Sequence, residues 1–356
     1  MYKKIFIVLM VLCLALTACA GTEKTKDAEK NDLSILLLIN GTLGDKSFFD
    51  SAEAGMELIK EKYPEITTKT IEMGTDETKY AAILEENVAS KAYDIIVAGT
   101  WQLKDKVQKI SEAYPEQKFI LFDDNANDGE KKYENIYSIL YKQNEGGFLA
   151  GALAGLVEQG EGYSFAKKTK NIGLIGGMDN KIVKDFLDGF EDGAKYIDKD
   201  VEVLTSYVGN FTDAIKAKDL ANILYKEKDV DIIFNVASIA GLGIIDSAAE
   251  TEHYVIGVDS DQAALLGEAK AKYILTSILK RVDISLLRAI DKYKAGEEIF
   301  GTTEVLGVKD DAIGIADNDF YKNTVSEADR AKINEIIDEI KADKITIRSE
   351  FNDKDK

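Results

Sequence analysis

The chain has few of the side chains from which catalytic and metal-binding sites are usually built. Its 356 residues include one histidine and two cysteines, too few for the Cys and His cluster that binds zinc. No Walker loop occurs, and "GLIGGM" (173–178) lacks the G-x-G-x-x-G spacing of a dinucleotide-binding turn. His253 lies just before an apolar segment with no nucleophile motif nearby, which favours a solvated or capping role. We therefore expect no enzymatic activity, no metal and no cofactor.

Basic residues are also scarce. The chain holds 45 Lys and Arg against 64 Asp and Glu, which gives a formal net charge of -19. Binding to nucleic acid or to an anionic lipid surface requires clustered Lys and Arg side chains that meet the phosphates. Neither is expected as a partner.

The long apolar run at the start of the chain is too short to span a bilayer core comfortably. Lys3 and Lys4 precede an apolar segment from Ile5 to Ala18, the pattern of an export signal. The segment ends in Leu-Thr-Ala-Cys19, which resembles the lipobox of bacterial lipoproteins, where the cysteine thiol is acylated, as with palmitate, before cleavage. Residues 1–18 are thus predicted to be a lipoprotein signal peptide and Cys19 the lipidation site. An uncleaved anchor with an incidental cysteine is the alternative.

The cysteine count agrees with an exported, lipid-anchored protein. Cys13 leaves with the signal peptide and Cys19 carries the lipid, so no thiol remains for a disulfide. Residues 19–32 are mainly polar and charged without a core pattern, as in a flexible tether. The mature protein is expected to work outside the cytoplasmic membrane.

Short apolar segments alternate with longer helical patterns from residue 34 onward, which indicates an α/β protein with parallel sheets. The segments are too uniformly apolar for strands exposed on one face. The clearest strands are "SILLLI" (34–39), "YDIIVAG" (93–99), "KFILF" (118–122), "NIGLIGG" (171–177), "VDIIFNV" (230–236) and "YVIGV" (254–258).

The first helix carries two neighbouring phenylalanines at its start. Ser47 can cap this helix, with Asp50 three residues later as a short capping box. Phe49 begins an apolar series at helical spacing and is assigned to the core face. Phe48, one residue earlier, projects about 100° away from Phe49 around the helix axis, near the N-terminal end of the helix.

The chain also contains an internal sequence repeat. "SILLLIN…SFFDSAEAG" aligns with "NIGLIGG…KDFLDGFEDG" at a shift of 137 residues, which places Phe49 on Phe186. "DIIVAGT" and "DIIFNVAS" share that shift, and Asp123 matches Asp259 at 136. Three ordered matches predict two similar lobes in tandem. Because ligands bind beyond the carboxyl ends of the strands in open α/β sheets, the facing edges of two lobes define a cleft.

Aromatic side chains occupy several of the loops that border this cleft. Phe48 and Phe211 each stand in a polar loop before a helix, in opposite lobes, where they can close on the two faces of one flat ligand. Trp101 lies in a third loop of the same rim. A role in the core is the alternative for each of the three.

Charged groups lie at matching strand ends. Asp123 and Asp259 can accept hydrogen bonds from ligand N–H or hydroxyl groups, provided that their charge is compensated. The alternative is that each caps the next helix. Lys280 in "TSILKR" can supply the compensation, although a lysine there can also be simply solvated.

These motifs together resemble the basic membrane protein family, the purine nucleoside receptor-like substrate-binding lipoproteins of ABC transporters. The resemblance runs from about Leu33 to Arg348. The segments that carry it are "GDKSFFDSAEAG", "YKQNEGGFLAGALAG", "NIGLIGGMDNKIVKDFLDGFEDGAK", "VGNFTDAIKAKDLA", "VDIIFNVASIAGLG" and "VIGVDSDQ…ILTSILK". It implies a type I periplasmic-binding-protein fold, with two Rossmann-like lobes joined by three crossing strands that close over a nucleoside.

The resemblance also implies roles for individual residues. Phe48 and Phe211 match the two stacking rings, Asp123 an acid that reads the base, Asp259 an acid that binds ribose hydroxyls, and Lys280 a lysine beside the ribose.

The chain departs from the family pattern at three positions. Asn40 stands where the family often has Asp, Phe49 where it usually has Asn, and Ser238 where a Gly is common. The departures at Asn40 and Phe49 leave open which purine base the site prefers. Asn40 and Ser238 complete the expected set of ligand-binding residues.

The sequence therefore predicts a membrane-anchored receptor that captures a purine nucleoside and delivers it to an ABC permease. The first lobe is expected at 33–140 with 281–302, the second at 141–280 with 303–346, and a frayed tail at 347–356. The rivals are a receptor for a sugar or another small polar ligand, a surface adhesin-like lipoprotein with a vestigial cleft, and an enzyme acting on nucleosides.

Overall fold

The computed structural model describes residues 33–351 except 128 and 130. The predicted signal peptide, the tether, Cys19 and residues 352–356 lie outside this part. Within it, no helix is long and apolar enough to cross a membrane.

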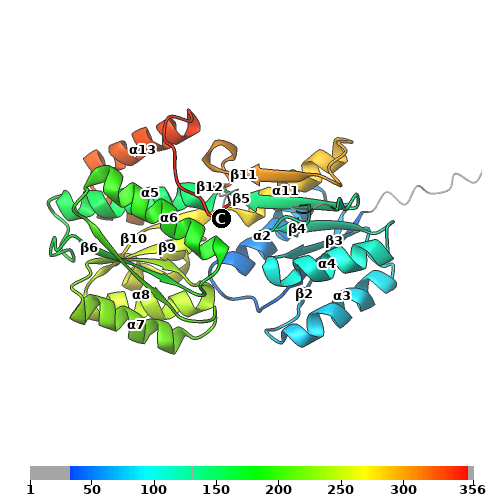
Figure 1. Cartoon of the computed structure of the whole chain (residues 1–356), viewed down its shortest axis with the longest axis horizontal. Helices are drawn as coiled ribbons and strands as arrows, with labels where there is room; N and C mark the ends of the chain where they lie inside the picture. Colours follow the sequence, from blue (N-terminus) through cyan, green and yellow to red (C-terminus); the bar gives the residue numbers. More distant parts are fainter. Residues whose placement is uncertain (1–32, 128, 130, 352–356) are drawn as a thin grey trace, which may run out of the picture.

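Two α/β lobes lie side by side along the long axis of the molecule (Figure 1). Each contains a six-stranded sheet, in the order β11-β5-β4-β3-β1-β2 in the first lobe and β12-β10-β9-β8-β6-β7 in the second. The two orders correspond strand for strand, which confirms the expected pair of Rossmann-like lobes; only the edge strands differ, since β11 runs parallel to its neighbour and β12 antiparallel.

The first lobe is formed mainly by the N-terminal part of the chain. Its strands are β1 (Ser34–Ile39), β2 (Thr67–Glu72), β3 (Ile95–Gly99), β4 (Lys118–Phe122), β5 (Ile136–Tyr141) and β11 (Thr303–Leu306). Its helices are α2 (Phe48–Lys62), η1 (Glu77–Lys79), α3 (Tyr80–Ala89), α4 (Trp101–Ala113) and α11 (Val282–Lys294).

The second lobe repeats this pattern and adds two short helices between β9 and β10 and two further helices near the C-terminus. Its strands are β6 (Asn171–Gly176), β7 (Glu202–Tyr207), β8 (Ile232–Val236), β9 (Tyr254–Asp259), β10 (Ile274–Lys280) and β12 (Ile313–Ile315). Its helices are α5 (Gln143–Gln159), α6 (Lys181–Ile197), α7 (Ala214–Glu227), η2 (Ser238–Ala240), α8 (Gly241–Thr251), α9 (Gln262–Leu266), α10 (Glu268–Ala271), η3 (Val308–Asp310), α12 (Asp319–Thr324) and α13 (Glu327–Lys341).

Helices cover both faces of each sheet, which explains the uniformly apolar strands. In β1, Ile35 and Leu37 pack in the cluster that includes Met56 of α2, whereas Leu36 packs in another with Leu84 of α3 and Leu103 of α4. Successive side chains of a strand point to opposite faces, so a strand buried on both sides needs apolar residues at every position.

Three segments pass between the lobes, and the third lies later than the sequence suggested. β11 pairs in parallel with β5, so residues 303–306 belong to the sheet of the first lobe. We expected the chain to leave that lobe after residue 302. The short strand adds backbone hydrogen bonds to a sheet edge without a strong apolar signal of its own, and this is why its lobe was misassigned.

The glycine-rich motif of α5 has a packing explanation. A Cβ atom on Gly151 would overlap the Phe190 carbonyl of α6, and one on Gly189 would overlap the Asn144 carbonyl of α5. Glycine is needed here because the two helix backbones touch. This contact fixes α6, whose first turns face the other lobe.

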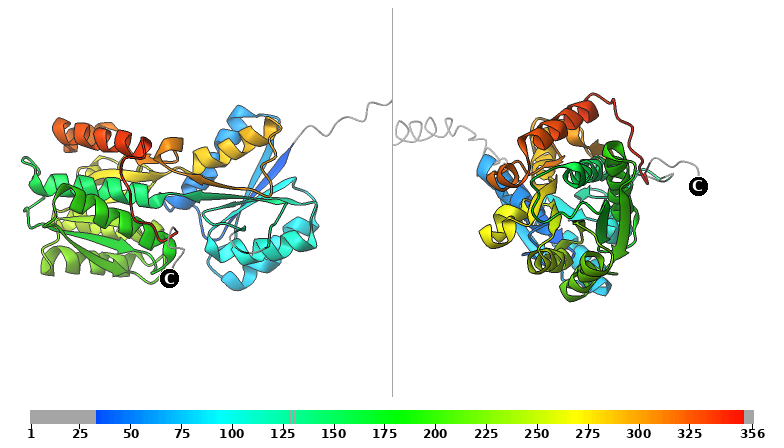
Figure 2. Two further views of the ribbon diagram at one scale, coloured as in Figure 1. Left: turned by 45° about the horizontal axis from the view of Figure 1, so that its top comes forward. Right: turned by 90° about the vertical axis from the view of Figure 1, so that its left-hand side faces the viewer.

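The segment after α13 is held on the protein up to residue 351, contrary to the frayed tail that we expected from residue 347 onward. Figure 1 shows it descending from α13 to α6, and Figure 2 shows the same course from two further directions. Arg348 forms ion pairs with Asp188, Glu191 and Asp192 of α6. Ser349 donates a hydrogen bond of 2.6 Å to Asp185. These partners lie far away in sequence, which explains why the polar tail sequence did not reveal them.

Candidate functional site

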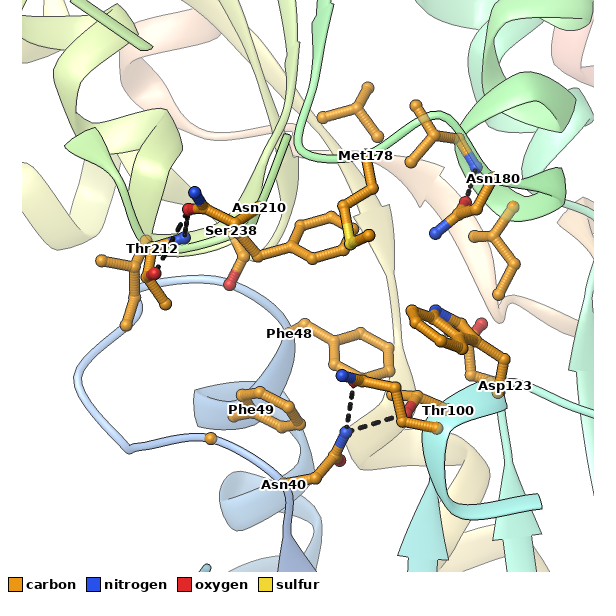
Figure 3. A pocket seen from close by; sticks show the side chains of 18 of the residues that line it. Asn40, Phe48, Phe49, Thr100, Asp123, Met178, Asn180, Asn210, Thr212 and Ser238 are labelled. Carbon is orange, nitrogen blue, oxygen red and sulfur yellow. Dashed lines mark hydrogen bonds between the residues drawn. The ribbon is translucent and has the colours of Figure 1, made fainter. Parts of the chain in front are cut away.

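A cavity of about 380 Å³ lies between the lobes (Figure 3). Its volume is within the range of pockets for small molecules. Loops at the carboxyl ends of the strands line it from both sides. All eight residues predicted to bind a ligand contribute to its wall: Asn40, Phe48, Trp101, Asp123, Phe211, Ser238, Asp259 and Lys280.

The two predicted stacking rings come from opposite lobes. The Phe48 ring packs edge-on against Phe49 and at a tilt against Phe122, with centroid distances of 5.4 and 5.5 Å. The Phe211 ring lies over Gly177, where a Cβ atom would overlap it. Both rings are half-buried, and both line the cavity.

Trp101 lies at the rim of the cavity, and the alternative that it belongs to the core is wrong. Its side chain is 39% exposed. Thr100 before it has a φ of +72°, in the left-handed region, and this sharp turn starts α4 directly at the cavity.

Lys280 and Asp123 form a buried ion pair across the two lobes. Lys280 ends β10 of the second lobe and is only 2% exposed, so it is not the solvated lysine of the alternative interpretation. Its ammonium group also lies 5.3 Å from the Phe48 ring centroid and 5.0 Å from that of Tyr141. Burial raises the pKa of Asp123, and the Lys280 charge opposes that rise.

Asp259 occupies the matching strand end in the second lobe. Its φ is +65° and that of Asp123 is +66°, so the backbone turns in the same way at both positions. Ser47 donates a hydrogen bond of 2.5 Å to its Oδ2 atom. Burial raises its pKa to about 7, despite the opposing effects of Lys280 and of the Ser47 hydroxyl. The next helix, α9, is capped by Asp261 instead.

Asn40 is buried at the end of β1. Its amide nitrogen donates to Thr100 Oγ1 at 2.9 Å and to Gln102 Oε1 at 2.8 Å (Figure 3). Its Oδ1 atom is buried without a hydrogen-bond partner among the described residues. A neutral amide in place of a carboxylate leaves the site with fewer negative charges.

The start of α2 differs from the capping arrangement that the sequence suggested. The Ser47 side chain forms no capping hydrogen bond because it points to Asp259. Asp45 accepts from the backbone amides of Phe49 and Asp50 instead. The Asp50 carboxylate reaches back to the amides of Gly44 and Lys46 rather than completing a capping box. Asp45 was missed because a capping side chain is expected directly before the helix, at Ser47, whereas Asp45 lies two residues earlier.

Several other residues of the wall were not predicted. Phe49 packs against the core, as expected, but also lines the cavity, and so does its repeat counterpart Phe186. The internal alignment of these two rings was a usable signal. The other unpredicted members include Thr42, Thr75, Glu77, Tyr80, Gln102, Met178, Asn180, Ile182, Val183, Asn210 and Thr212.

His253 lies away from the cavity and is buried, so of the solvated or capping role that the sequence favoured, the solvated role is wrong. Its backbone amide donates to the Ala248 carbonyl at the end of α8. Its ring stacks on Tyr225 with centroids 4.6 Å apart. Its two nitrogens lie 3.0 Å from Thr251 Oγ1 and 3.4 Å from Lys167 Nζ. The stacking partner is 28 residues earlier in the chain, beyond the reach of local sequence patterns.

The cavity combines flat aromatic surfaces with buried carboxylates and one buried cation. This is an arrangement for holding a small polar ligand that has a flat part. The part of the chain described by the structure contains no group of three or more His, Cys, Asp or Glu residues that could hold a metal ion.

Comparison with known proteins supports a role in transport. Residues 33–346 match the family model described as ABC transporter substrate-binding protein PnrA-like. Basic membrane protein D of Borreliella burgdorferi (strain JD1) is 30% identical over 331 residues, covering 92% of this chain and 90% of that protein.

Solved structures of solute-binding proteins have the same fold. An ABC transporter solute-binding protein from Aeropyrum pernix K1 superposes with a TM-score of 0.78 at 23% identity, covering 89% of this chain and 93% of that one. A periplasmic solute-binding protein from Actinobacillus succinogenes 130z with bound D-allose gives a TM-score of 0.61 at 16% identity, covering 82% of this chain and 100% of that one. These similarities confirm the periplasmic-binding-protein fold.

Proposed function

This chain belongs to the PnrA-like substrate-binding proteins of ABC transporters, and from that premise we propose that its cleft captures a purine nucleoside. The family consists of substrate-binding proteins rather than enzymes, which confirms the expectation that the chain is not an enzyme. Such proteins act outside the cytoplasm and hand their ligand to a transporter.

The pair of aromatic rings carries the proposal. Phe48 and Phe211 line one cavity from opposite lobes. A purine base between them stacks on both faces, and each ring contributes about 1–3 kcal/mol to binding. Because the two lobes each supply one ring, the full gain is available only when the cleft is closed, so the ligand favours closure.

The carboxylates support a nucleoside over a free base. The Asp123–Lys280 pair offers both an acceptor and a donor beside the Phe48 ring. Asp259 offers a second acceptor, suited to hydroxyl groups of a ribose. In this assignment Asp123 reads the base, Lys280 lies beside the ribose, and Asn40, Trp101 and Ser238 complete the wall.

Calorimetry tests this function. Inosine, guanosine and adenosine are expected to bind with micromolar or tighter affinity, whereas hexoses and free purine bases bind much more weakly. Asp259→Ala is expected to remove the preference for inosine over hypoxanthine. An equal loss for nucleoside and base would contradict the ribose assignment, and tight binding of a hexose alone would contradict the nucleoside proposal.

A sugar is the second candidate ligand, because the solute-binding protein from Actinobacillus succinogenes was solved with D-allose. Aromatic rings also stack on pyranose faces. The same panel, with D-allose included, separates the two candidates.

We also propose that Cys19 carries the lipid anchor and that a permease takes up the released ligand. Incorporation of an alkyne-labelled palmitate into the unsubstituted protein, and its absence from Cys19→Ser, is the expected result. Labelling of Cys19→Ser would contradict the assignment.

A further inference from the structure

In addition to the Lys280–Asp123 pair, a group of hydrogen bonds joins the lobes at a short segment before α2. Residues 45–47 belong to the first lobe, and four side chains of the second lobe bond to them: Ser238, Asp259, Ser260 and Gln262. We call these seven residues the clasp. The second-lobe partners lie at or just beyond the ends of β8 and β9. Asp259 pairs with Leu279 of β10, beside one crossing between the lobes, whereas Ser238 follows β8, one strand further from that crossing.

The Asp45 carboxylate is completely buried and uses all its acceptor positions. Its Oδ1 atom accepts from the amides of Ser47 and Asp50, and its Oδ2 atom accepts from the amide of Phe49. Ser238 Oγ donates the fourth hydrogen bond, at 3.0 Å to Oδ2. A carboxylate offers about four lone-pair sites. Three of the four acceptor positions of Asp45 are therefore used within the first lobe, and the fourth is used only by a donor from the opposite lobe.

Ser238 holds a backbone conformation that disfavours its side chain. Its φ is +50°, in the left-handed region where glycine is the least strained residue. The hydroxyl is therefore present at a cost to local stability. The hydrogen bond across the lobes to Asp45 is a stabilising contact that glycine could not make.

Ser47 provides the second side-chain link. It is completely buried, and its hydroxyl donates to Asp259 Oδ2. Asp259 is also part of the cavity wall. One carboxylate thus joins the clasp to the ligand site.

We propose that Ser238, beyond its place in the cavity wall, acts together with Ser47 as a positioning residue that closes the cleft through Asp45 and Asp259. The clasp holds a substantial fraction of the protein closed before ligand arrives and slows ligand release afterwards. The inference requires only a substrate-binding cleft and is independent of which ligand fills it.

Ser238→Gly is the decisive variant because it separates closure from folding. It removes the cross-lobe hydroxyl and also relieves the left-handed strain, so the melting temperature of the ligand-free protein is expected to stay the same or rise. A purely structural role for the hydroxyl predicts a lower melting temperature instead.

Trp101 provides a probe that needs no ligand. It is the single tryptophan of the chain and lines the cavity. Acrylamide quenching of its fluorescence is expected to be stronger in ligand-free Ser238→Gly and Ser47→Ala than in the unsubstituted protein, because an open cleft admits the quencher. Unchanged quenching in both variants would overturn the proposal, even if no nucleoside binds.

Stopped-flow fluorescence with inosine supplies the kinetic test. Loss of one net hydrogen bond corresponds to about a 2- to 10-fold change, and this increase is expected in the inosine dissociation rate of Ser238→Gly. Ser238→Ala, which keeps the strain but lacks the hydroxyl, is expected to release inosine equally fast. Equal rates in the unsubstituted protein and Ser238→Ala would contradict the clasp.

Ser326→Ala is the matched control. Ser326 also donates from its hydroxyl to a carboxylate, that of Asp329, but both residues lie in the second lobe at the start of α13. This variant is expected to leave the quenching and the dissociation rate unchanged. A comparable change there would show that the effect is not specific to the cleft.

Discussion

The two lobes share a scaffold but carry different chemistry at equivalent positions. Their sheets have the same order, and Asp123 and Asp259 turn the backbone with nearly the same φ. Asp123 is paired with a buried ammonium group, whereas Asp259 has a serine hydroxyl as its hydrogen-bond donor. The two lobes thus share the backbone geometry at this position, and the neighbouring side chains give each carboxylate its own electrostatic environment.

The aromatic rings break the symmetry further. Phe48 follows β1, whereas Phe211 follows β7, so the two rings do not occupy equivalent loops. The repeat counterpart of Phe48 is Asp185, at the internal shift of 137 residues. Asp185 holds the C-terminal segment through Ser349 and the amide of Glu350. Equivalent positions in the two lobes therefore line the cavity in one lobe and hold the C-terminal segment in the other.

Removal of the cation from the first carboxylate is expected to have the largest effect. Lys280→Met leaves Asp123 buried without its partner, which costs about 3–5 kcal/mol of unfolding free energy. Denaturant unfolding measures the loss. The double variant Lys280→Met with Asp123→Asn is the control and is expected to recover most of it, because no unpaired charge remains. Failure of the double variant to recover would show that packing of the lysine stem matters more than its charge.

Loss of either ring is expected to weaken inosine binding by about 1–3 kcal/mol, but the two variants differ in stability. Phe48→Ala removes contacts with Phe49 and Phe122 and should lower the melting temperature of the ligand-free protein. Phe211→Ala should hardly change it, since that ring lies at the cavity over a glycine. Calorimetry and thermal unfolding together separate the two roles. Equal destabilisation by both variants would remove the distinction between the lobes.

The second carboxylate is expected to make binding depend on pH. The pKa of Asp259 is raised to about 7 by burial, so its acceptor form becomes populated as the pH rises from 6 to 8. If the ionised form binds ribose, inosine affinity increases by about tenfold over this range. Calorimetry at several pH values measures the inosine affinity, and Asp259→Asn should make this affinity nearly independent of pH. An unchanged slope in Asp259→Asn would assign the dependence to another group.

The same group also affects the stability of the ligand-free protein, with the opposite sign. Its folded pKa lies above the unfolded value of 3.8, so the folded state binds the proton more tightly. This contribution favours folding at low pH and is lost as the pH rises through 7. Unfolding at pH 5 and pH 7 in the unsubstituted protein and in Asp259→Asn isolates it.

The smallest effect is expected where the C-terminal segment contacts α6. Arg348→Ala removes ion pairs with α6 from a side chain that is half exposed, and such surface pairs are worth about 0–1 kcal/mol. Thermal unfolding should show a slight loss, and inosine affinity should not change. A clear loss of affinity would show that the C-terminal segment affects the cavity through α6.

The fold and most of the candidate site were accessible from the sequence. The strand pattern and the internal repeat placed both lobes and the loops that form the cleft, because local apolar patterns report buried strands directly. Three features could not be predicted from the sequence: the contact of the C-terminal segment with α6, the lobe to which β11 belongs, and the surroundings of His253. Each depends on partners far away in the chain.

The sequence by itself determined which loops carry aromatic and acidic side chains, since strand ends and helix starts follow from local patterns. Only the tertiary structure decided which of these side chains meet. It paired Lys280 with Asp123, turned Ser47 from the helix end to Asp259, and gave Asp45 its fourth donor from the opposite lobe. Such contacts form when two independently patterned halves pack together, and their geometry is set by the packing of the whole molecule.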